Sequence, residues 1–231
     1  MELPRYGTPN IAYVSTWFGA PDDHPMWALN LMKYRTVAEY ADGRESSISG
    51  ADADMLYNPT GPLAAVGAGV RLVTEVTHQL SGDSILWDRV AVAWYPSRMA
   101  MLEMQTLPEF QELHAHKDAG MEFTIVMATT PSADTAEPYD WSGLGDDDLM
   151  LVQVVADSSA TDLAQLVPSR RIGRYDVRGV IVGDERGWAE ARYDAISRDD
   201  VDALVAAAAA HADPSVYAMV VEPRFDVMPA R

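Results

Sequence analysis

The side chains best suited to chemistry lie in one short stretch, LPEFQELHAHKDAGMEF, at residues 107–123. It contains two histidines, His114 and His116, followed by Lys117 and Asp118. A neutral imidazole with a pKa of about 6.5 can accept or donate a proton at physiological pH, which makes His116 a candidate general acid or base. A histidine that ends a helix and binds a backbone carbonyl fits the same pattern.

The spacing of the two histidines would also suit a metal site, but only in a strand. Alternate residues of a strand share one face, whereas two positions two apart in a helix differ by roughly 200° at about 100° per residue. The preceding PEFQEL favours a helix, so we expect no metal, with His116 facing a cavity and His114 facing away from it. A haem would need an axial histidine, for which His78, His114, His116 and His211 are equal candidates.

The segment MWALNLMKY, residues 26–34, supplies a second group of candidates. If it is a strand, Asn30, Met32 and Tyr34 share one face. Asn30 could act on a substrate carbonyl or bind only a neighbouring backbone group, because a buried amide needs a partner. Met32 and Tyr34 are candidate substrate contacts. Arg35 could pair with a substrate carboxylate or form a surface salt bridge.

Trp87 and Asp88 begin another predicted strand. Asp88 could orient His116 as a hydrogen-bond acceptor, or could simply cap the turn before the strand. Trp87 and Trp94 could form a platform for an apolar substrate or belong to the core. The sequence therefore predicts a site with His116, Asp88 and Asn30 as its catalytic residues.

The composition excludes several classes of function. The chain of 231 residues has 35 acidic and 17 basic side chains and a formal net charge of −18, which disfavours nucleic acid and anionic membranes as partners. It has no cysteine, so thiolate metal sites and cysteine nucleophiles are excluded. The N-terminal residues do not have the pattern expected of a signal peptide, and the sequence has no run of roughly 18 apolar residues. We expect a cytoplasmic protein, monomer or homodimer, that binds a small molecule without a cofactor.

The order of predicted elements indicates two copies of one topology, β-α-β-β-α-β, which is typical of ferredoxin-like folds. Strands such as VAVAWY carry apolar residues at both parities, so both faces of each sheet must be buried. We therefore predict an α+β protein in which two tandem ferredoxin-like repeats pack sheet to sheet as an α/β barrel within one chain. The predicted strands are 26–34, 69–80, 84–95, 122–129, 149–155, 172–184, 187–196 and 215–223, and the predicted helices are 36–49, 96–106, 159–168 and 197–212.

Composition also divides the chain into domains. Residues 129–148 are rich in Pro, Gly, Ser and Asp, which predicts a linker over 131–148. The first repeat, 1–130 with its N-terminal extension, carries the candidate site, and the second, 149–231, is expected to act as a scaffold. The segment 44–66 is predicted to rim the cavity as a lid, because it is longer than a simple connection needs.

Four motifs in order give the first repeat a family resemblance. Over about residues 26–130 it resembles the DUF1330-type branch of the dimeric α/β-barrel superfamily. The resemblance implies that His116 is the histidine of the family motif. Gly120, which follows in that motif, would let the chain reverse into the last strand, because glycine tolerates positive φ. The motifs are NLMKYR (30–35), GPLAAVGAGVRL (61–72), WDRVAVAWYPSR (87–98) and LPEFQELHAHKDAGMEFTIVMAT (107–129).

The resemblance implies one fold but several possible functions. Members of this superfamily include cofactor-free monooxygenases, small-molecule lyases and isomerases, haem enzymes of the chlorite-dismutase type and proteins without known activity. The sequence predicts an enzyme without metal or redox cofactor that acts on a mostly apolar substrate in the barrel, by histidine-assisted acid/base chemistry. A non-catalytic binder of a hydrophobic metabolite and a haem-binding barrel are the alternatives.

Overall fold

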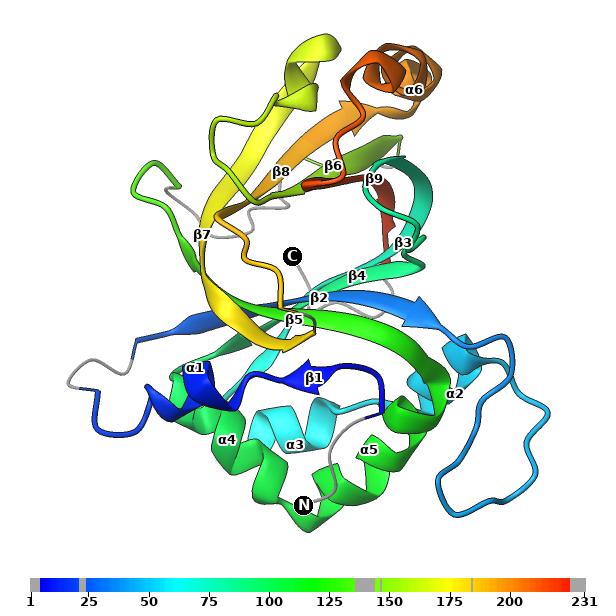
Figure 1. Cartoon of the computed structure of the whole chain (residues 1–231), viewed down its shortest axis with the longest axis vertical. Coiled ribbons are helices and arrows are strands. Elements are labelled where there is room, and N and C mark those ends of the chain that lie inside the picture. The colour runs from blue at the N-terminus through cyan, green and yellow to red at the C-terminus, as the bar shows by residue number, and fades with distance from the viewer. Residues whose placement is uncertain (1–4, 21–23, 136–143, 146, 184, 225–231) are drawn as a thin grey trace. The chain divides into compact units, whose positions relative to one another are not determined.

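The computed structural model describes residues 5–20, 24–135, 144–145, 147–183 and 185–224 of the chain (Figure 1). The strands are β1 (Thr8–Pro9), β2 (Met26–Tyr34), β3 (Gly69–Ser81), β4 (Arg89–Tyr95), β5 (Met121–Pro131), β6 (Asp148–Val155), β7 (Ser169–Gly183), β8 (Glu190–Ser197) and β9 (Val216–Pro223). The α-helices are α1 (Ile11–Ser15), α2 (Gly50–Tyr57), α3 (Thr60–Ala65), α4 (Arg98–Thr106), α5 (Pro108–Gly120) and α6 (Val201–Ala208). The 3-10 helices are η1 (Leu163–Leu166), η2 (Arg198–Asp200) and η3 (Ala209–His211).

Eight of the strands form a closed ring. They are hydrogen-bonded in the order β7-β5-β2-β4-β3-β9-β6-β8, a further β7–β8 pairing closes the ring, and β1 adds to β7. The first repeat contains β2 to β5, which lie in the order β5-β2-β4-β3 within the ring. The second contains β6 to β9, which lie in the equivalent order β9-β6-β8-β7. Each half therefore has the strand order of a ferredoxin-like sheet. The predicted fold class, two ferredoxin-like repeats joined as an α/β barrel within one chain, is confirmed.

The residues group into two compact units, and β3, β4, β5 and β7 contribute to both. In the first unit, α3, α4 and α5 lie on one face of β2 and β5 (Figure 1), where residues of these helices share a core with Met26 and Ala28 of β2. In the second unit, α6 packs on one face of β6 and β9. The first unit is Met1–Val70, Val92–Ala128 and Val180–Glu185; the second is Arg71–Ala91, Thr129–Gly179 and Arg186–Arg231.

The predicted helix over 36–49 is wrong. This segment is an extended loop, held by a hydrogen bond from the Ala38 N–H to the Ile48 carbonyl and turned at Gly43, whose φ is 77°. The helix begins only at Gly50, because Ser49 and Asp52 form a reciprocal capping box around its first turn.

The predicted lid over 44–66 is also wrong. The segment contains α2, which packs against α5, and α3, which contacts α4 and α5. It therefore belongs to the helical layer of the first unit. Nothing in the described part of the chain is a helix long and apolar enough to cross a membrane.

In the second repeat, only a 3-10 turn forms where a helix over 159–168 was expected. The Asp162 side chain accepts from the Ala164 N–H and starts η1 at Leu163. The expected strands of both repeats agree with the observed strands to within about five residues at each end. The division into a motif-bearing domain and a scaffolding domain stays a prediction.

Candidate functional site

Helix α5 positions the two histidines and the lysine of the sequence motif. Pro108 stands in its first turn, where the missing N–H loses no intrahelical hydrogen bond. Glu109 in the first turn and Lys117 in the last turn both suit the helix dipole. Phe110, His114 and Lys117 follow one another at positions i, i+4 and i+7, so their side chains form one stripe along the helix.

His114 lies in an aromatic environment. Its ring centroid is 5.3 Å from that of Phe110 and 6.4 Å from that of Tyr57, and its Nε2 is 2.7 Å from the hydroxyl oxygen of Tyr6. Burial, aided by the positive charge of Lys117, lowers the pKa of His114 to about 4. Burial also raises the pKa of Tyr6. At neutral pH the phenol therefore donates to Nε2, which assigns the imidazole proton to Nδ1.

The ammonium group of Lys117 rests on aromatic faces. Its Nζ is 5.2 Å from the ring centroid of Tyr57 and 5.9 Å from that of Tyr6, which are cation–π distances. Burial lowers the pKa of Lys117, although the negative charge of Asp54 opposes this shift. Asp54 is fixed in turn by the Tyr34 hydroxyl, which donates to its Oδ2 over 2.6 Å. We call this group the Lys117 cluster; its members are Tyr6, Tyr34, Asp54, Tyr57, His114 and Lys117.

His116 lies on another side of α5. Its Nδ1 is 2.7 Å from the hydroxyl oxygen of Tyr40, and the two rings meet at an angle of 88°. The expectation that the two histidines point in different directions holds, because both lie in a helix. Tyr6 from the N-terminal segment covers the side of the helix that carries His114. The expectation that His116 faces a cavity and His114 faces away from it stays a prediction. The acid/base role predicted for His116 stays a prediction.

A surface pocket opens beside α5. In it, the Arg44 guanidinium carbon lies 3.7 Å from the centroid of the Tyr40 ring. Asp118 is held by Arg5, whose backbone N–H and Nε donate to its two carboxylate oxygens at 2.9 and 2.6 Å. The pocket therefore combines paired charges with an aromatic wall, one residue along α5 from Lys117. Its lining residues are Tyr40, Ala41, Asp42, Arg44, Ala115 and Asp118.

Gly120 ends α5 for a reason other than the one predicted. It is not among the glycines with positive φ. A Cβ at Gly120 would lie 2.4 Å from the carbonyl oxygen of Gly50, and a Cβ at Gly50 would lie 2.3 Å from the carbonyl oxygen of Gly120. The two glycines therefore allow α2 and α5 to approach closely. Ala53 and Ala119, both fully buried, extend this contact.

The predicted residues of β2 face the helices of the first unit. Ala28 packs in the core beneath those helices. Asn30, Met32 and Tyr34 alternate with the intervening residues in the same way and lie on the same face of the strand as Ala28. Asn30 donates through Nδ2 to the Ala28 carbonyl over 2.9 Å, which is the backbone alternative considered for it. Met32 is buried, and Tyr34 reaches the Lys117 cluster. The structure thus brings the Tyr34 hydroxyl to Asp54.

Arg35, just after β2, is held mainly through its backbone. Its N–H donates to the Gly120 carbonyl over 2.9 Å, and its carbonyl accepts from the Gly50 N–H over 3.0 Å. One guanidinium nitrogen lies 3.3 Å from the Glu39 carboxylate, whose side chain is exposed. Trp94 in β4 is half-buried. Substrate contacts by Arg35 and Trp94 stay predictions.

Trp87 and Asp88 belong to the second compact unit. Trp87 is buried, its backbone N–H donates to Gln79 Oε1 over 3.0 Å, and its ring meets that of Tyr217 edge to face at 5.3 Å. The Asp88 carbonyl accepts from the Val76 N–H over 3.0 Å. Its predicted role toward His116 stays a prediction.

Sequence reasoning missed Tyr6, Asp54 and Tyr57 and assigned no role to Lys117. Tyr6 is 108 residues away from its partner His114, and no local pattern predicts such a contact. Lys117 did leave a signal, because it occupies a position on the stripe that begins with buried Phe110. Among the described residues, no group of three or more His, Asp or Glu side chains could hold a metal ion.

The geometry can be compared with that of known proteins. No protein-family model and no curated protein matches the sequence. The crystal structure of methylated RPA0582 is similar, at 27% sequence identity and a TM-score of 0.50, over 57% of this chain and 98% of that chain. A second structure of RPA0582, described as a protein of unknown function from Rhodopseudomonas palustris, matches at 27% identity and a TM-score of 0.46, over 53% and 94%.

A third similar structure is a chlorite dismutase mutant from Candidatus Nitrospira defluvii, at 9% identity and a TM-score of 0.45, over 87% of this chain and 92% of that chain. At such identity a likeness concerns the fold alone. The closed ring of two ferredoxin-like sheets defines the class: an α/β-barrel protein whose two sheets come from one chain.

Proposed function

We propose that this chain is a small-molecule enzyme in which the Lys117 cluster transfers a proton from a mostly apolar substrate, without a metal or redox cofactor. The observation that carries the proposal is the position of Lys117 Nζ on the faces of Tyr57 and Tyr6. Burial there lowers the pKa of Lys117, so its neutral amine forms more readily than that of an exposed lysine. Lysines whose pKa is lowered by burial can act as general bases, and groups with shifted pKa values concentrate at functional sites.

The neighbours of Lys117 suit this role. The Tyr6 and Tyr57 rings would exclude water and contact an apolar substrate. The hydrogen bond between Tyr6 and His114 fixes one wall of the cluster. Asp54, anchored by Tyr34, would stabilise the ammonium that forms when Lys117 takes a proton. Isomerases, lyases and cofactor-free monooxygenases can all begin by removing a proton from carbon, so the cluster is compatible with each of these reaction types.

His116 is the second candidate for the acid or base. Tyr40 engages its Nδ1, which leaves Nε2 for a substrate bound in the pocket lined by Tyr40 and Asp118. The DUF1330-type assignment belongs to the same proposal and rests on the four motifs between residues 30 and 129. A non-catalytic binder of a hydrophobic metabolite would use the same surroundings.

The test is deuterium exchange at carbon, followed by proton NMR, for a panel of small apolar ketones in D2O. Wild-type protein should accelerate exchange of at least one ketone, and Lys117→Met should lower that rate about 10²-fold or more. Lys33→Met, which changes the one other lysine of the sequence, is the matched control and should keep the rate. Exchange that survives in Lys117→Met would overturn the assignment of the base. A ketone that binds through Lys117 but never exchanges would favour the binder.

A further inference from the structure

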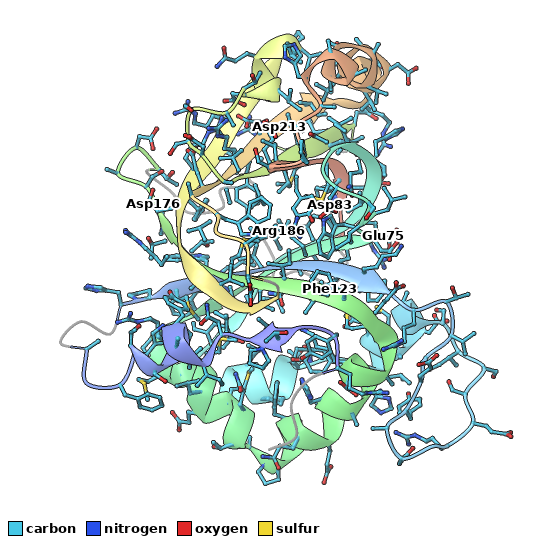
Figure 2. All side chains as sticks on the ribbon, in the orientation of Figure 1. Glu75, Asp83, Phe123, Asp176, Arg186 and Asp213 are labelled. Atoms are coloured by element: carbon cyan, nitrogen blue, oxygen red, sulfur yellow. The ribbon has the colours of Figure 1, made fainter. Side chains whose placement is uncertain are left out.

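A charged and aromatic cluster in the second compact unit has no part in the proposed proton transfer. Arg186 donates from Nη1 to Asp83 Oδ2 over 2.6 Å, and the Tyr217 hydroxyl donates to the same oxygen over 2.8 Å. Figure 2 labels Asp83 and Arg186, which lie beside one another. The guanidinium carbon is 5.2 Å from the ring centroid of Tyr217 and 5.5 Å from that of Trp188. The charge pair is thus set among aromatic rings.

The rings form a continuous aromatic wall. The centroids of Trp188 and Tyr217 are 5.1 Å apart at 32°, and Trp87 meets Tyr217 edge to face at 5.3 Å. Tyr217 lies in β9 with the parity opposite to Ala218 and Val220, which pack under α6. The wall therefore stands on the face of the strand that α6 does not cover.

The position of Asp83 in this cluster is fixed. Its Oδ1 accepts from the Ile85 N–H over 2.8 Å, which leaves Oδ2 to Arg186 and Tyr217. Burial acts to raise the pKa of Asp83, but these hydrogen bonds outweigh it and hold the pKa below its usual value. Gly82 has a φ of 145°, and a Cβ there would lie 2.6 Å from the Tyr217 ring. The turn is therefore shaped for this contact, and the Asp83–Arg186 pair carries no net charge at neutral pH.

The indole donor of Trp188 lacks an acceptor. Trp188 is 7% exposed, and its indole Nε1 makes no hydrogen bond within the described part of the protein. Buried donors are nearly always paired, so such an atom calls for a ligand or an ordered water. The cluster is accessible, because the side chains of Arg186 and Asp83 are 34% and 30% exposed. A Cβ at Gly187 would meet no atom within 4 Å, so there is open space beside the residue that precedes Trp188.

We propose that Trp87, Trp188, Tyr217 and the Asp83–Arg186 pair form a binding site for an uncharged, flat aromatic molecule that carries a carbonyl oxygen. The aromatic wall takes the flat body of the ligand by stacking. The carbonyl accepts from the indole N–H of Trp188. A neutral ligand is favoured because Asp83 already balances Arg186 and because the protein as a whole has a net charge of −18. The site is separate from the Lys117 cluster, which lies in the first unit.

Three naphthalenes of similar size test the class of ligand. 2-Acetylnaphthalene carries a neutral carbonyl, 2-naphthoate carries an anionic acceptor, and 2-ethylnaphthalene carries neither. Dissociation constants from NMR titration of the full-length protein should rank the ketone as tightest, by about 3- to 10-fold over the hydrocarbon, the ratio expected for one neutral hydrogen bond. Tighter binding of the naphthoate, or no binding of the ketone at 1 mM, would overturn the proposal.

Two tryptophan variants test the location of the site. Trp188→Phe keeps an apolar ring but removes the donor, so ketone and hydrocarbon should then bind equally. Trp17→Phe is the matched control, because Trp17 Nε1 is also buried without an acceptor, yet Trp17 packs in the core of the first unit. If Trp188→Phe fails to fold, the Trp188 indole proton of the wild type should move downfield with the ketone and not with the hydrocarbon. A ketone preference that survives in Trp188→Phe, or an unmoved indole proton, would refute the site.

Discussion

The two compact units hold a cationic side chain in different ways. In the second unit, Arg174 of β7 has its Nη1 2.9 Å from Asp194 Oδ2 and its Nη2 3.0 Å from Asp162 Oδ2. Gln153 donates to Asp162 over 2.7 Å. In the first unit, Lys117 meets only aromatic faces, and no carboxylate among the described residues forms an ion pair with it. Arg174 is thus held by two carboxylates, whereas Lys117 lies against aromatic rings.

This difference separates a structural network from a candidate for chemistry. Burial acts to lower the pKa of Arg174, but the hydrogen bonds and charges of Asp194 and Asp162 outweigh it and raise the pKa. For Lys117 burial prevails and lowers the pKa. A group stabilised in its charged form by fixed partners contributes to folding, whereas a group poised between two protonation states can exchange a proton.

The largest expected effect comes from removing the paired cation. Arg174→Met leaves the buried Asp194 carboxylate without this cation and Asp162 with only the hydrogen bonds from Gln153 and Ala164. The free energy of unfolding should therefore fall by about 3–5 kcal/mol in urea denaturation. Lys117→Met removes a charge that forms no ion pair among the described residues and should change stability by less than about 1 kcal/mol. The control is Arg198→Met, which breaks an exposed pair with Glu222 and should stay within about 1 kcal/mol. Equal losses at Arg174 and Lys117 would abolish the distinction between the two units.

The next effect depends on pH. The folded-state pKa of His114 is about 4, below its unfolded value of about 6.5. The unfolded chain therefore gains a proton at this position first, and stability is lost as the pH falls from about 6.5 to about 4. At 1.36 kcal/mol per pH unit this amounts to about 3 kcal/mol.

Hydrogen exchange followed at different pH values separates the units. Burial acts to raise the pKa of Asp162, but Gln153 and Arg174 hold it below its usual value, so the contribution of Asp162 is lost only below about pH 4. Amides of α5 should thus lose protection at a higher pH than those of β8. His114→Phe should remove the pH dependence from α5, and His116→Gln, on another side of the same helix, is the control. Simultaneous loss in α5 and β8 would show that the two units respond as one.

The sequence predicts the sheets better than the site, for physical reasons. The strand at residues 26–34 is found at its predicted bounds because its pattern and its flanks are local. The helix predicted at 36–49 failed because Ser49 and Asp52 cap a helix that starts later. The Lys117 cluster needs Tyr6 from the N-terminal segment and Asp54 from α2. Those contacts depend on tertiary packing, and a periodic pattern along α5 gives no information about which side chains cover its stripe.

A smaller effect tests how α2 is brought to Lys117. Gly120→Ala places a Cβ 2.4 Å from the Gly50 carbonyl oxygen, and because the obstacle is backbone the two helices must separate. The free energy of unfolding should fall by about 1–3 kcal/mol. Gly187→Ala is the control in the second unit, because its Cβ meets no atom within 4 Å. The displaced α2 carries Asp54, so the pKa of Lys117, followed by NMR of its side chain, should fall further. An unchanged Lys117 titration would show that Asp54 does not act on it.

The smallest expected effect distinguishes the two histidines of α5. The hydrogen bond between Tyr40 and His116 Nδ1 joins the helix to the loop after β2. Tyr40→Phe and His116→Gln should each lower the free energy of unfolding by about 1 kcal/mol. The double variant should lose less than the sum, because both changes remove the same bond. With Lys117 as the base, ketone exchange in His116→Gln should stay within about threefold of wild type. If instead exchange falls about 10²-fold at unchanged stability, the acid or base is His116, and the paired hydroxyl of Tyr40 orients it rather than merely fastening the loop.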